Sequence, residues 1–269
     1  MRETDKALLD IEKRILEVLK SIDKSNVSKE TQSLINAIEC LTDYFGHRSK
    51  FEQEFSANVS HELRTPLAGI RLQTELAMSS QDYTLQEKAH KNILTAVAHS
   101  ERLIEQLLIL SRLSIDPVDL IKSKVNIGQL SARVVGELVD VAEGKGVILA
   151  MNPWRDCFLQ ADEGSLSILL HNLIRNAIHY SPQGEKVTTQ VKNRKNNISL
   201  SIIDNGPGIP PDQYDLVLER FKKVSCDTKS GSGLGLSIAK RICDLHDATL
   251  TFSRTSKTSG FEVTVTFLK

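Results

Sequence analysis

The segment "SHELRTPL" at residues 60–67 places a histidine beside a carboxylate, with a proline five positions further on. If His61 is neutral, Glu62 can accept one imidazole N–H, which fixes the tautomer and makes the other ring nitrogen a better nucleophile. Adjacent residues do not share a helix face, so this contact needs particular rotamers, whereas Thr65 lies one turn on and shares the face of His61. A solvated histidine without a chemical role is the alternative that these residues leave open.

Pro66 lies inside the helical pattern of the same segment. It cannot donate to the carbonyl of Glu62, and its ring crowds that carbonyl, so the helix is expected to loosen just after the histidine. Residue 61 lies about 200° around the helix axis from both Val59 and Leu63, which belong to the apolar stripe. His61 is therefore expected to face water.

A second group of polar residues and glycines lies far downstream of the histidine. The segment "LLHNLIRNAIHYSP" places Asn172 and Asn176 four positions apart, on one helix face. Such a pair could be two buried amides in mutual hydrogen bonds.

Two glycine-rich segments follow the asparagines. In "DNGPGIP", Asp204 ends a β-rich run, and Gly206 and Gly208 permit a tight turn there. In "GSGLGLSIAK", glycines open a helix whose backbone N–H groups could hold phosphate. Each motif is weak alone, because turns in general use these residues. Their order along the chain carries more weight.

Helical periodicity dominates the part of the chain that carries His61. Residues 1–114 have almost no glycine and one proline. Residues 1–50 predict two short helices with coiled-coil seams, for which an ordinary hairpin and a signal-relay role both remain open. The next helix buries one stripe, and the polar "SSQDYT" separates it from a helix over about 85–113. Two such helices cannot bury their apolar stripes alone, which favours a four-helix bundle from two chains. The stripe consists of Phe55, Val59, Leu63, Pro66, Ile70, Thr74 and Ala77.

After Pro117 strands appear between helices, so a domain boundary is expected near residue 120. Strands alternate with helices, and the last two strands have the pattern of a hairpin. This arrangement indicates an α/β sandwich with a largely antiparallel sheet. The expected fold class is thus multidomain, with a helical dimerisation bundle followed by an α/β sandwich. Helices are predicted at 128–143, 162–180 and 233–246, and strands at 147–151, 186–192, 198–204, 249–254 and 260–268.

Composition excludes several classes of protein. The 34 basic and 34 acidic residues cancel, so the chain lacks the basic footprint of a nucleic-acid binder. The four cysteines lie far apart without a CxxC pair, which indicates neither a disulfide framework nor a thiolate metal site and suits a reducing cytosol. No apolar run approaches the roughly 18 residues that span a bilayer, so a soluble chain is expected.

Five segments together resemble the boxes of the sensor histidine kinases of two-component systems. In chain order they are "SHELRTPL" for the H box, "LLHNLIRNAIHYSP" for N, "DNGPGIP" for G1, "ERF" with Phe221 for F, and "GSGLGLSIAK" for G2. The resemblance implies that His61 is the phosphoacceptor, that Glu62 is the base assisting phosphoryl transfer, and that Thr65 positions water for dephosphorylating the partner. Arg64 is expected to help hold Glu62 or the incoming phosphate. The implied partners are a second copy of the chain and the receiver domain of a response regulator, with no nucleic acid.

The same resemblance implies a Bergerat-type ATP-binding domain, the fold shared with gyrase-like ATPases. ATP and Mg²⁺ are then the expected cofactors, with Asn176 as metal ligand and Asn172 close by. Asp204 would accept the exocyclic amine of adenine. Tyr180 and Ile209 would line the adenine pocket, and Phe221 would anchor the lid. The other implied nucleotide-binding residues are His179, Gly206, Gly208, Lys223, Gly231, Gly233, Gly235 and Leu236.

Two departures from the family pattern bear on activity. His179 stands where many relatives have lysine, so a fixed charge beside the phosphates becomes pH-dependent. The lid "KKVSCDTKSGSG" is short and lacks arginine, which leaves Lys222, Lys223 and Lys229. Lysine lacks the bidentate fork of arginine, so weak ATP binding or slow autophosphorylation is expected.

The predicted domains are a HAMP-like segment at 1–50, a dimerisation and phosphotransfer hairpin at 51–114, a linker at 115–123 and the ATP-binding domain at 124–269. The family architecture implies a parent protein in the bacterial inner membrane, of which this chain is the cytoplasmic piece. Two other functions are compatible with parts of this pattern. One is a dimeric scaffold or regulator phosphatase with a degenerate ATP domain, favoured by the short lid. The other is a gyrase- or chaperone-type ATPase, against which the H-box argues.

Overall fold

The computed structural model describes residues 55–113, 120–152, 156–224, 231–254 and 260–269. Contacts divide the chain into two units, Met1–Gly69 and Ile70–Lys269, and each is considered by itself. The predicted HAMP-like segment and most of the predicted linker lie outside the described residues. None of the described helices has the length and apolar content needed to cross a bilayer.

The helix that carries His61 covers residues 55–79. The loosening expected at Pro66 produces no break in it, because proline removes one backbone hydrogen bond while those of its neighbours remain. Thr65 Oγ1 donates to the carbonyl of His61 at 3.2 Å. The predicted apolar stripe is half-buried along this helix, except at Thr74, which is exposed.

A short turn at residues 80–82 joins this helix to α3 (Tyr83–Leu113). Asp82 Oδ1 accepts the backbone N–H of Thr84 at 2.8 Å, so α3 begins two residues before the expected Leu85. Gln86 Nε2 donates to the carbonyl of Ser80 at 2.8 Å and holds the turn closed. Asn92 Nδ2 donates to Gln73 Oε1 at 3.2 Å across the two helices. The expected helical hairpin is therefore present.

Five strands form the main sheet of the α/β part, in the order β2-β4-β5-β7-β6. Only the β2–β4 pair is parallel, so the largely antiparallel sheet expected from the sequence is confirmed. A separate antiparallel pair is formed by β1 and β3. The strands are β1 (Ser123–Asn126), β2 (Ile148–Met151), β3 (Phe158–Ala161), β4 (Lys186–Asn193), β5 (Asn197–Asp204), β6 (Thr249–Arg254) and β7 (Phe261–Leu268).

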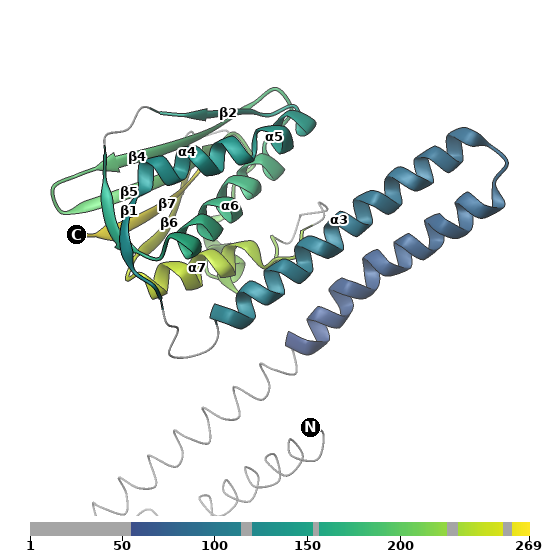
Figure 1. Ribbon diagram of the computed structural model, residues 1–269, viewed down its shortest axis with the longest axis horizontal. Helices are drawn as coiled ribbons and strands as arrows, with labels where there is room; N and C mark the ends of the chain where they lie inside the picture. Colours follow the sequence, from purple (N-terminus) through teal and green to yellow (C-terminus); the bar gives the residue numbers. More distant parts are fainter. Residues whose placement is uncertain (1–54, 114–119, 153–155, 225–230, 255–259) are drawn as a thin grey trace, which may run out of the picture. The chain divides into compact units, whose positions relative to one another are not determined.

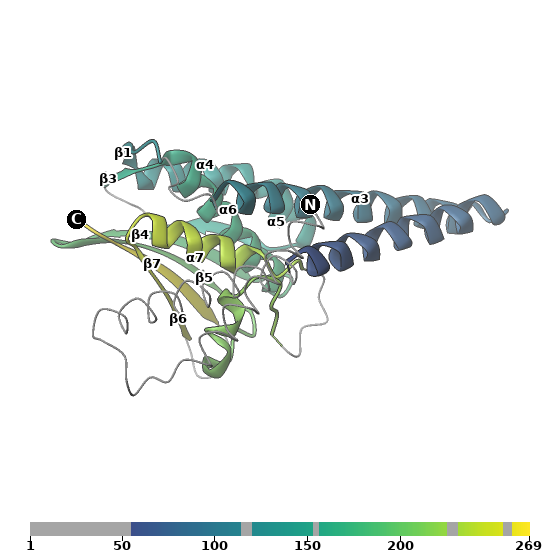
Figure 2. The same ribbon diagram turned by 90° about the horizontal axis from the view of Figure 1, so that it is seen from below.

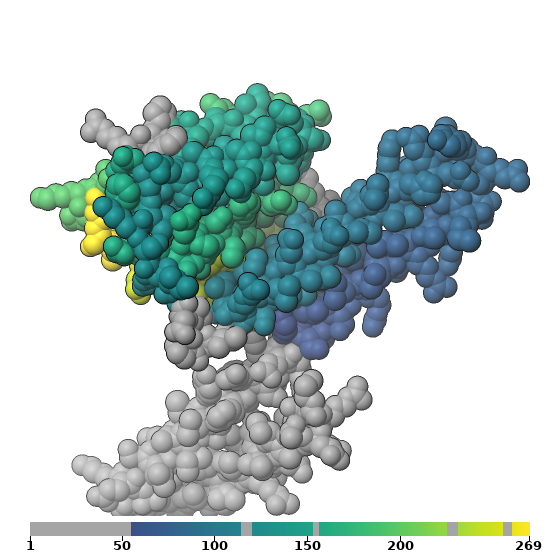
Figure 3. Space-filling model, viewed as in Figure 1, coloured from purple at the N-terminus to yellow at the C-terminus, as the bar shows by residue number. Residues whose placement is uncertain are grey.

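Helices cover one face of this sheet, and the two turned views show them as a single layer (Figures 1 and 2). In the space-filling view they pack against one another without a gap (Figure 3). Burial alternates along β7, and along β5 except at Ser201, which is buried between Leu200 and Ile202, as expected for strands with one face on a core. Leu166, Leu169 and Leu170 are fully buried and anchor the central helix against the strands. The helices are α4 (Ile127–Glu137), α5 (Val139–Lys145), α6 (Glu163–Tyr180) and α7 (Gly235–Leu245), with 3₁₀ turns η2 (Pro211–Gln213) and η3 (Leu216–Leu218).

Two sequence predictions in this part were incomplete. The helix expected at 128–143 is divided at Leu138, whose φ of −103° and ψ of 3° leave the helical region. Its N–H bonds to the carbonyl of Val135 at 3.2 Å, which closes a tighter turn. β1 and β3 were not predicted, because each has four residues and pairs with a strand distant in sequence, so neither offers a local pattern.

Candidate nucleotide-binding site

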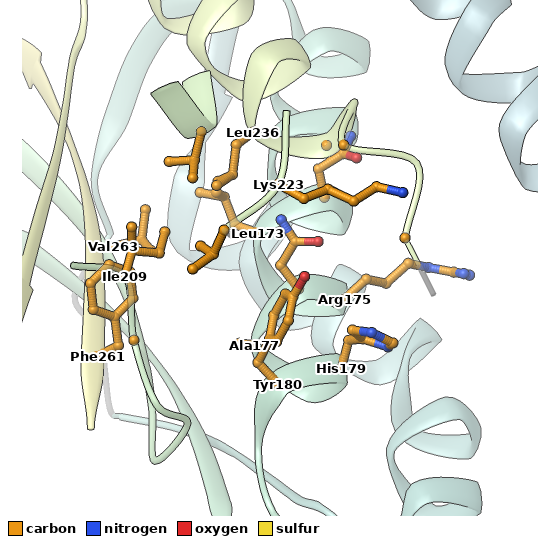
Figure 4. Close-up of a pocket in the computed structure, with 18 of the residues that line it drawn as sticks. Leu173, Arg175, Ala177, His179, Tyr180, Ile209, Lys223, Leu236, Phe261 and Val263 are labelled. Atoms are coloured by element: carbon orange, nitrogen blue, oxygen red, sulfur yellow. The ribbon is translucent and has the colours of Figure 1, made fainter. Parts of the chain in front are cut away.

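A cavity of about 510 Å³ lies beside α6, the start of α7 and the end of β5. Predicted site residues from three motifs meet there, although up to 64 positions separate them in the sequence. Figure 4 shows the labelled basic side chains Lys223, Arg175 and His179 at one end, with apolar Ile209, Phe261 and Val263 at the other. Such a cavity suits a ligand with one flat apolar part and one anionic part. The predicted residues in its lining are Asn172, Asn176, His179, Tyr180, Asp204, Gly208, Ile209, Lys223, Gly231, Gly233, Gly235 and Leu236.

Helix α6 is held at both ends, which fixes the polar face that it turns to the cavity. At its start Asp162 Oδ1 accepts the backbone N–H of Ser165 at 2.7 Å. At its end Lys145 Nζ donates to the carbonyls of Ile178, at 2.6 Å, and of His179. A cation is favourable at this end, because the carbonyls of the last turn carry partial negative charge.

The two asparagine amides lie against the first turn of α7. A Cβ added to Gly235 would stand 3.3 Å from both Asn172 Oδ1 and Asn176 Nδ2, so glycine permits this close approach. Asn172 Nδ2 donates to the carbonyl of Ile168 at 2.9 Å, and its Oδ1 accepts from Gln106 Nε2 at 3.3 Å. Within the described residues no hydrogen bond joins Asn172 to Asn176, so the alternative of mutually paired amides is not formed. The N-cap residue of α7 is Leu234, whose side chain has no acceptor, so an anion could serve the N–H groups of that turn.

Asp204 ends β5 with only 6% of its surface exposed. Its Oδ1 accepts the N–H of Gly206 at 2.7 Å. Burial raises the pKa of the carboxyl to about 6, and the Gly206 bond offsets only part of that rise. A Cβ at Gly206 would stand 2.8 Å from Asp204 Oδ1 and 3.0 Å from the Tyr180 carbonyl. Gly206 does not line the cavity; its N–H holds the carboxyl that does.

We expect Asp204→Asn to stabilise the nucleotide-free chain near neutral pH. The folded-state pKa of about 6 lies above the ordinary 3.8, so the charged carboxylate costs stability fully above pH 6 and not at all below 3.8. Denaturant unfolding near pH 7 should show a gain of up to about 3 kcal/mol, which disappears near pH 4. The exposed Asp212→Asn is the control and should show no gain. Equal gains at both pH values would contradict the burial argument.

Phe221 and the glycine loop adopt an unusual backbone conformation together. Phe221 has a φ of 62°, in the left-handed region that is costly for a non-glycine residue. Its N–H donates to the carbonyl of Gly233 at 3.0 Å, and Gly233 has a φ of 68°. Phe221 is not among the lining residues, so its backbone braces the glycine loop while its ring stays outside the cavity. Lys229 lies outside the described residues.

The four predicted catalytic residues belong to the other unit of the chain. His61 is exposed, as expected from its position opposite the apolar stripe. Glu62 is half-buried, and Arg64 and Thr65 are exposed. The backbone bond of Thr65 described above keeps its side chain on the same face as His61.

Two family models match the two parts of the chain. The His Kinase A (phospho-acceptor) domain matches residues 51–114, and the ATPase family of histidine kinases, DNA gyrase B and HSP90 matches residues 161–269. This chain belongs to the sensor histidine kinases of two-component systems. The match to the phospho-acceptor domain argues against the alternative of a gyrase- or chaperone-type ATPase, which would not require such a domain.

Relatives and solved structures agree with this family. The Sensor protein QseC of Salmonella typhimurium is 34% identical over 251 residues, covering 91% of this chain and 54% of QseC. The chain thus spans about half the length of the relatives it matches. Full-length ShkA in complex with AMPPNP is similar with a TM-score of 0.57 and 25% identity, over 80% of this chain and 45% of ShkA. ThkA in complex with the response regulator TrrA has a TM-score of 0.66 at 21% identity, covering 84% of this chain and 66% of that one, which shows a shared fold.

The cavity of this histidine kinase also contains residues that the sequence analysis missed. Arg175 lies three positions after Asn172 and four before His179, so helical spacing alone places it on the same face of α6. Arg102 and Gln106 line the cavity from α3, and no sequence pattern connects them with the nucleotide motifs. They could be found only from the tertiary structure.

Proposed function

We propose that this chain is the cytoplasmic catalytic part of a sensor histidine kinase, which transfers the γ-phosphoryl group of ATP to His61 and then to an aspartate of a response regulator. The proposal rests on one cavity in which Asn176, Asp204 and the glycine loop meet. The same chain carries an exposed His61 within its match to the phospho-acceptor domain. Family membership supports both half-reactions.

The transfer requires a neutral imidazole. A ring nitrogen of His61 attacks the γ-phosphorus, a P–N bond forms, and the bond from that phosphorus to the bridging oxygen breaks, so that ADP leaves. The imidazole proton passes to Glu62, which lies one residue on and acts as base. The phosphoimidazole then gives its phosphoryl group to the carboxylate of the regulator. Arg64 is exposed beside them and is suited to the incoming phosphate.

The cavity fits a nucleotide with Mg²⁺. Amide oxygens of Asn172 and Asn176 lie beside the first turn of α7, and oxygen is the ligand that Mg²⁺ prefers. Within the described residues no group of three or more His, Cys, Asp or Glu side chains could hold a metal ion. Asn176 would therefore share the ion with phosphate oxygens, and the bound ion would neutralise phosphate charge. Asp204 would accept the exocyclic amine of adenine, between Tyr180 and Ile209.

A dimer through the helical hairpin would cover a stripe of exposed apolar residues on α3. Leu94 is 69% exposed and Leu108 56%, and their spacing places them on one side of the helix with Val97 and Ile104. A second hairpin with the same stripe would bury both in a four-helix bundle. Apolar surface of this extent is otherwise unfavourable in water.

Regulator dephosphorylation and membrane attachment complete the proposal. The Thr65 hydroxyl needs only a rotation about χ1 to leave the His61 carbonyl and hold a water molecule near the regulator's phosphoaspartate. Because the chain spans about half of its relatives' length, we infer a parent protein in the bacterial inner membrane with its sensor outside this piece. Residues 1–50 would relay the signal as a HAMP-like segment.

Incubation with γ-labelled ATP and Mg²⁺ tests the kinase reaction. The wild-type chain should acquire acid-labile, alkali-stable label, and His61→Gln should acquire none, because no other residue replaces the nucleophile. His90→Gln, an exposed histidine of α3, is the control and should label normally. An unlabelled wild type that still dephosphorylates a regulator would instead establish the phosphatase-dominant alternative.

A further inference from the structure

Two arginines from different parts of the fold line the same cavity. Arg102 lies on α3 and Arg175 on α6, and both contribute to the lining. Burial lowers the pKa of the half-buried Arg102, and the nearby charge of Arg175 lowers it further. Within the described residues, neither guanidinium makes an ion pair with a carboxylate. Two like charges, the half-buried Arg102 and the exposed Arg175, therefore line one cavity without a carboxylate partner among the described residues.

Two hydrogen bonds of Gln106 fix the face of α3 that carries Arg102. Gln106 lies one turn further on the same face. Its Oε1 accepts the hydroxyl of Ser232 at 2.6 Å, and its Nε2 donates to Asn172 Oδ1 at 3.3 Å. Ser232 is itself buried within the glycine loop. At the end of α3, Arg241 Nε donates to the carbonyl of Leu113 at 2.9 Å. Arg102 is therefore held at the cavity by bonds on its own helix.

We propose that Arg102 and Arg175 together bind the terminal phosphates of the nucleotide, so that the hairpin helix α3 supplies part of the nucleotide site. This inference rests on the proposed function, since it names further phosphate-binding residues of the same cavity. Phosphate oxygens would remove the repulsion between the two guanidiniums and accept their forked N–H donors. Arg175 lies at the basic end of the cavity, opposite the apolar end suited to adenine (Figure 4).

Such a pair has two consequences. The two arginines provide bidentate donors, which the short lid lacks. The slow autophosphorylation expected from a lid with only lysines is then no longer required. The pair also makes nucleotide affinity depend on α3, which belongs to the same hairpin as His61. The dependence should be largest for the nucleotide with the most phosphates, and smallest for adenosine.

Binding titrations with adenosine, ADP and a non-hydrolysable ATP analogue, each with Mg²⁺, test the assignment in the full chain. Arg102→Gln and Arg175→Gln should each weaken the ATP analogue about 10-fold or more, the loss expected for a charge-assisted hydrogen bond. Adenosine affinity should stay within about 2-fold of wild type, because no phosphate contact is removed. The matched control is Arg112→Gln, an exposed arginine in the last turn of α3.

The outcomes separate this inference from the proposed function. Wild-type affinity of Arg102→Gln for the ATP analogue would overturn the inference and leave the kinase proposal standing. An equal loss for adenosine and the analogue would also overturn it, because Arg102 would then be supporting the fold. A wild-type chain that binds none of the three ligands would overturn both. Should Arg102→Gln not fold, Arg102→Lys keeps the charge without the fork and should weaken only the analogue.

Discussion

Asn176→Ala is expected to reduce the labelling of His61 by about 100-fold or more, because a metal ion contributes several kcal/mol to stabilising the transferred phosphoryl group. The amide of Asn176 lies against the first turn of α7, where Gly235 leaves space for it, so alanine removes the oxygen without a clash. Labelling with γ-labelled ATP over a range of Mg²⁺ concentrations measures the loss. Higher Mg²⁺ should recover part of the activity.

The dimer should survive this substitution. Asn176 lies on α6, whereas the apolar stripe proposed for dimerisation lies on α3. Analytical ultracentrifugation should therefore give the same mass for wild type and Asn176→Ala. Asn193→Ala, at the exposed end of β4, is the matched control and should keep full labelling. A variant that labels fully would contradict the assignment of metal binding to this amide, and a monomeric variant would contradict the separation of nucleotide binding from dimerisation.

Gly233→Ala is expected to lower the labelling rate about 10-fold or more, whereas Gly144→Ala, at an exposed position of α5, should leave it nearly unchanged. Gly233 has a φ of 68°, and an added Cβ would stand 2.7 Å from the backbone carbonyl carbon of Phe221 and 2.9 Å from the Lys222 oxygen. Backbone atoms cannot yield as a flexible side chain does, so the glycine loop must move. At Gly144 an added Cβ meets nothing within 4 Å among the described residues.

This pair of variants separates local from global damage. The hydrogen bond from Phe221 to Gly233 should break, and amide hydrogen exchange should speed up around both residues. Core helices such as α6 should keep their protection, because Leu166 and Leu170 are unaffected. If both glycine variants label at the wild-type rate, the loop conformation has no role in nucleotide binding.

Much of the fold follows from local patterns. The spacing of apolar residues places the two hairpin helices, and the strand and helix patterns after residue 120 indicate the α/β part with its largely antiparallel sheet. The exposure of His61 follows from its position two residues from Val59 and Leu63. Pro66 shows the limit of such reasoning, since one missing hydrogen bond predicted a loosened helix, whereas the helix continues. The domain limits and the roles of the site residues remain predictions.

The sequence by itself determined the motifs and their order, because histidine, asparagine and glycine carry their chemistry wherever the chain places them. It also determined the helical face that holds Asn172 and Asn176, because helix geometry is local. Only the tertiary structure decided what depends on contacts between distant segments: the burial that raises the pKa of Asp204, the pairing of β1 with β3, and the presence of Arg102 and Arg175 in the lining of one cavity. Burial and charge proximity are properties of packing, which no local pattern contains.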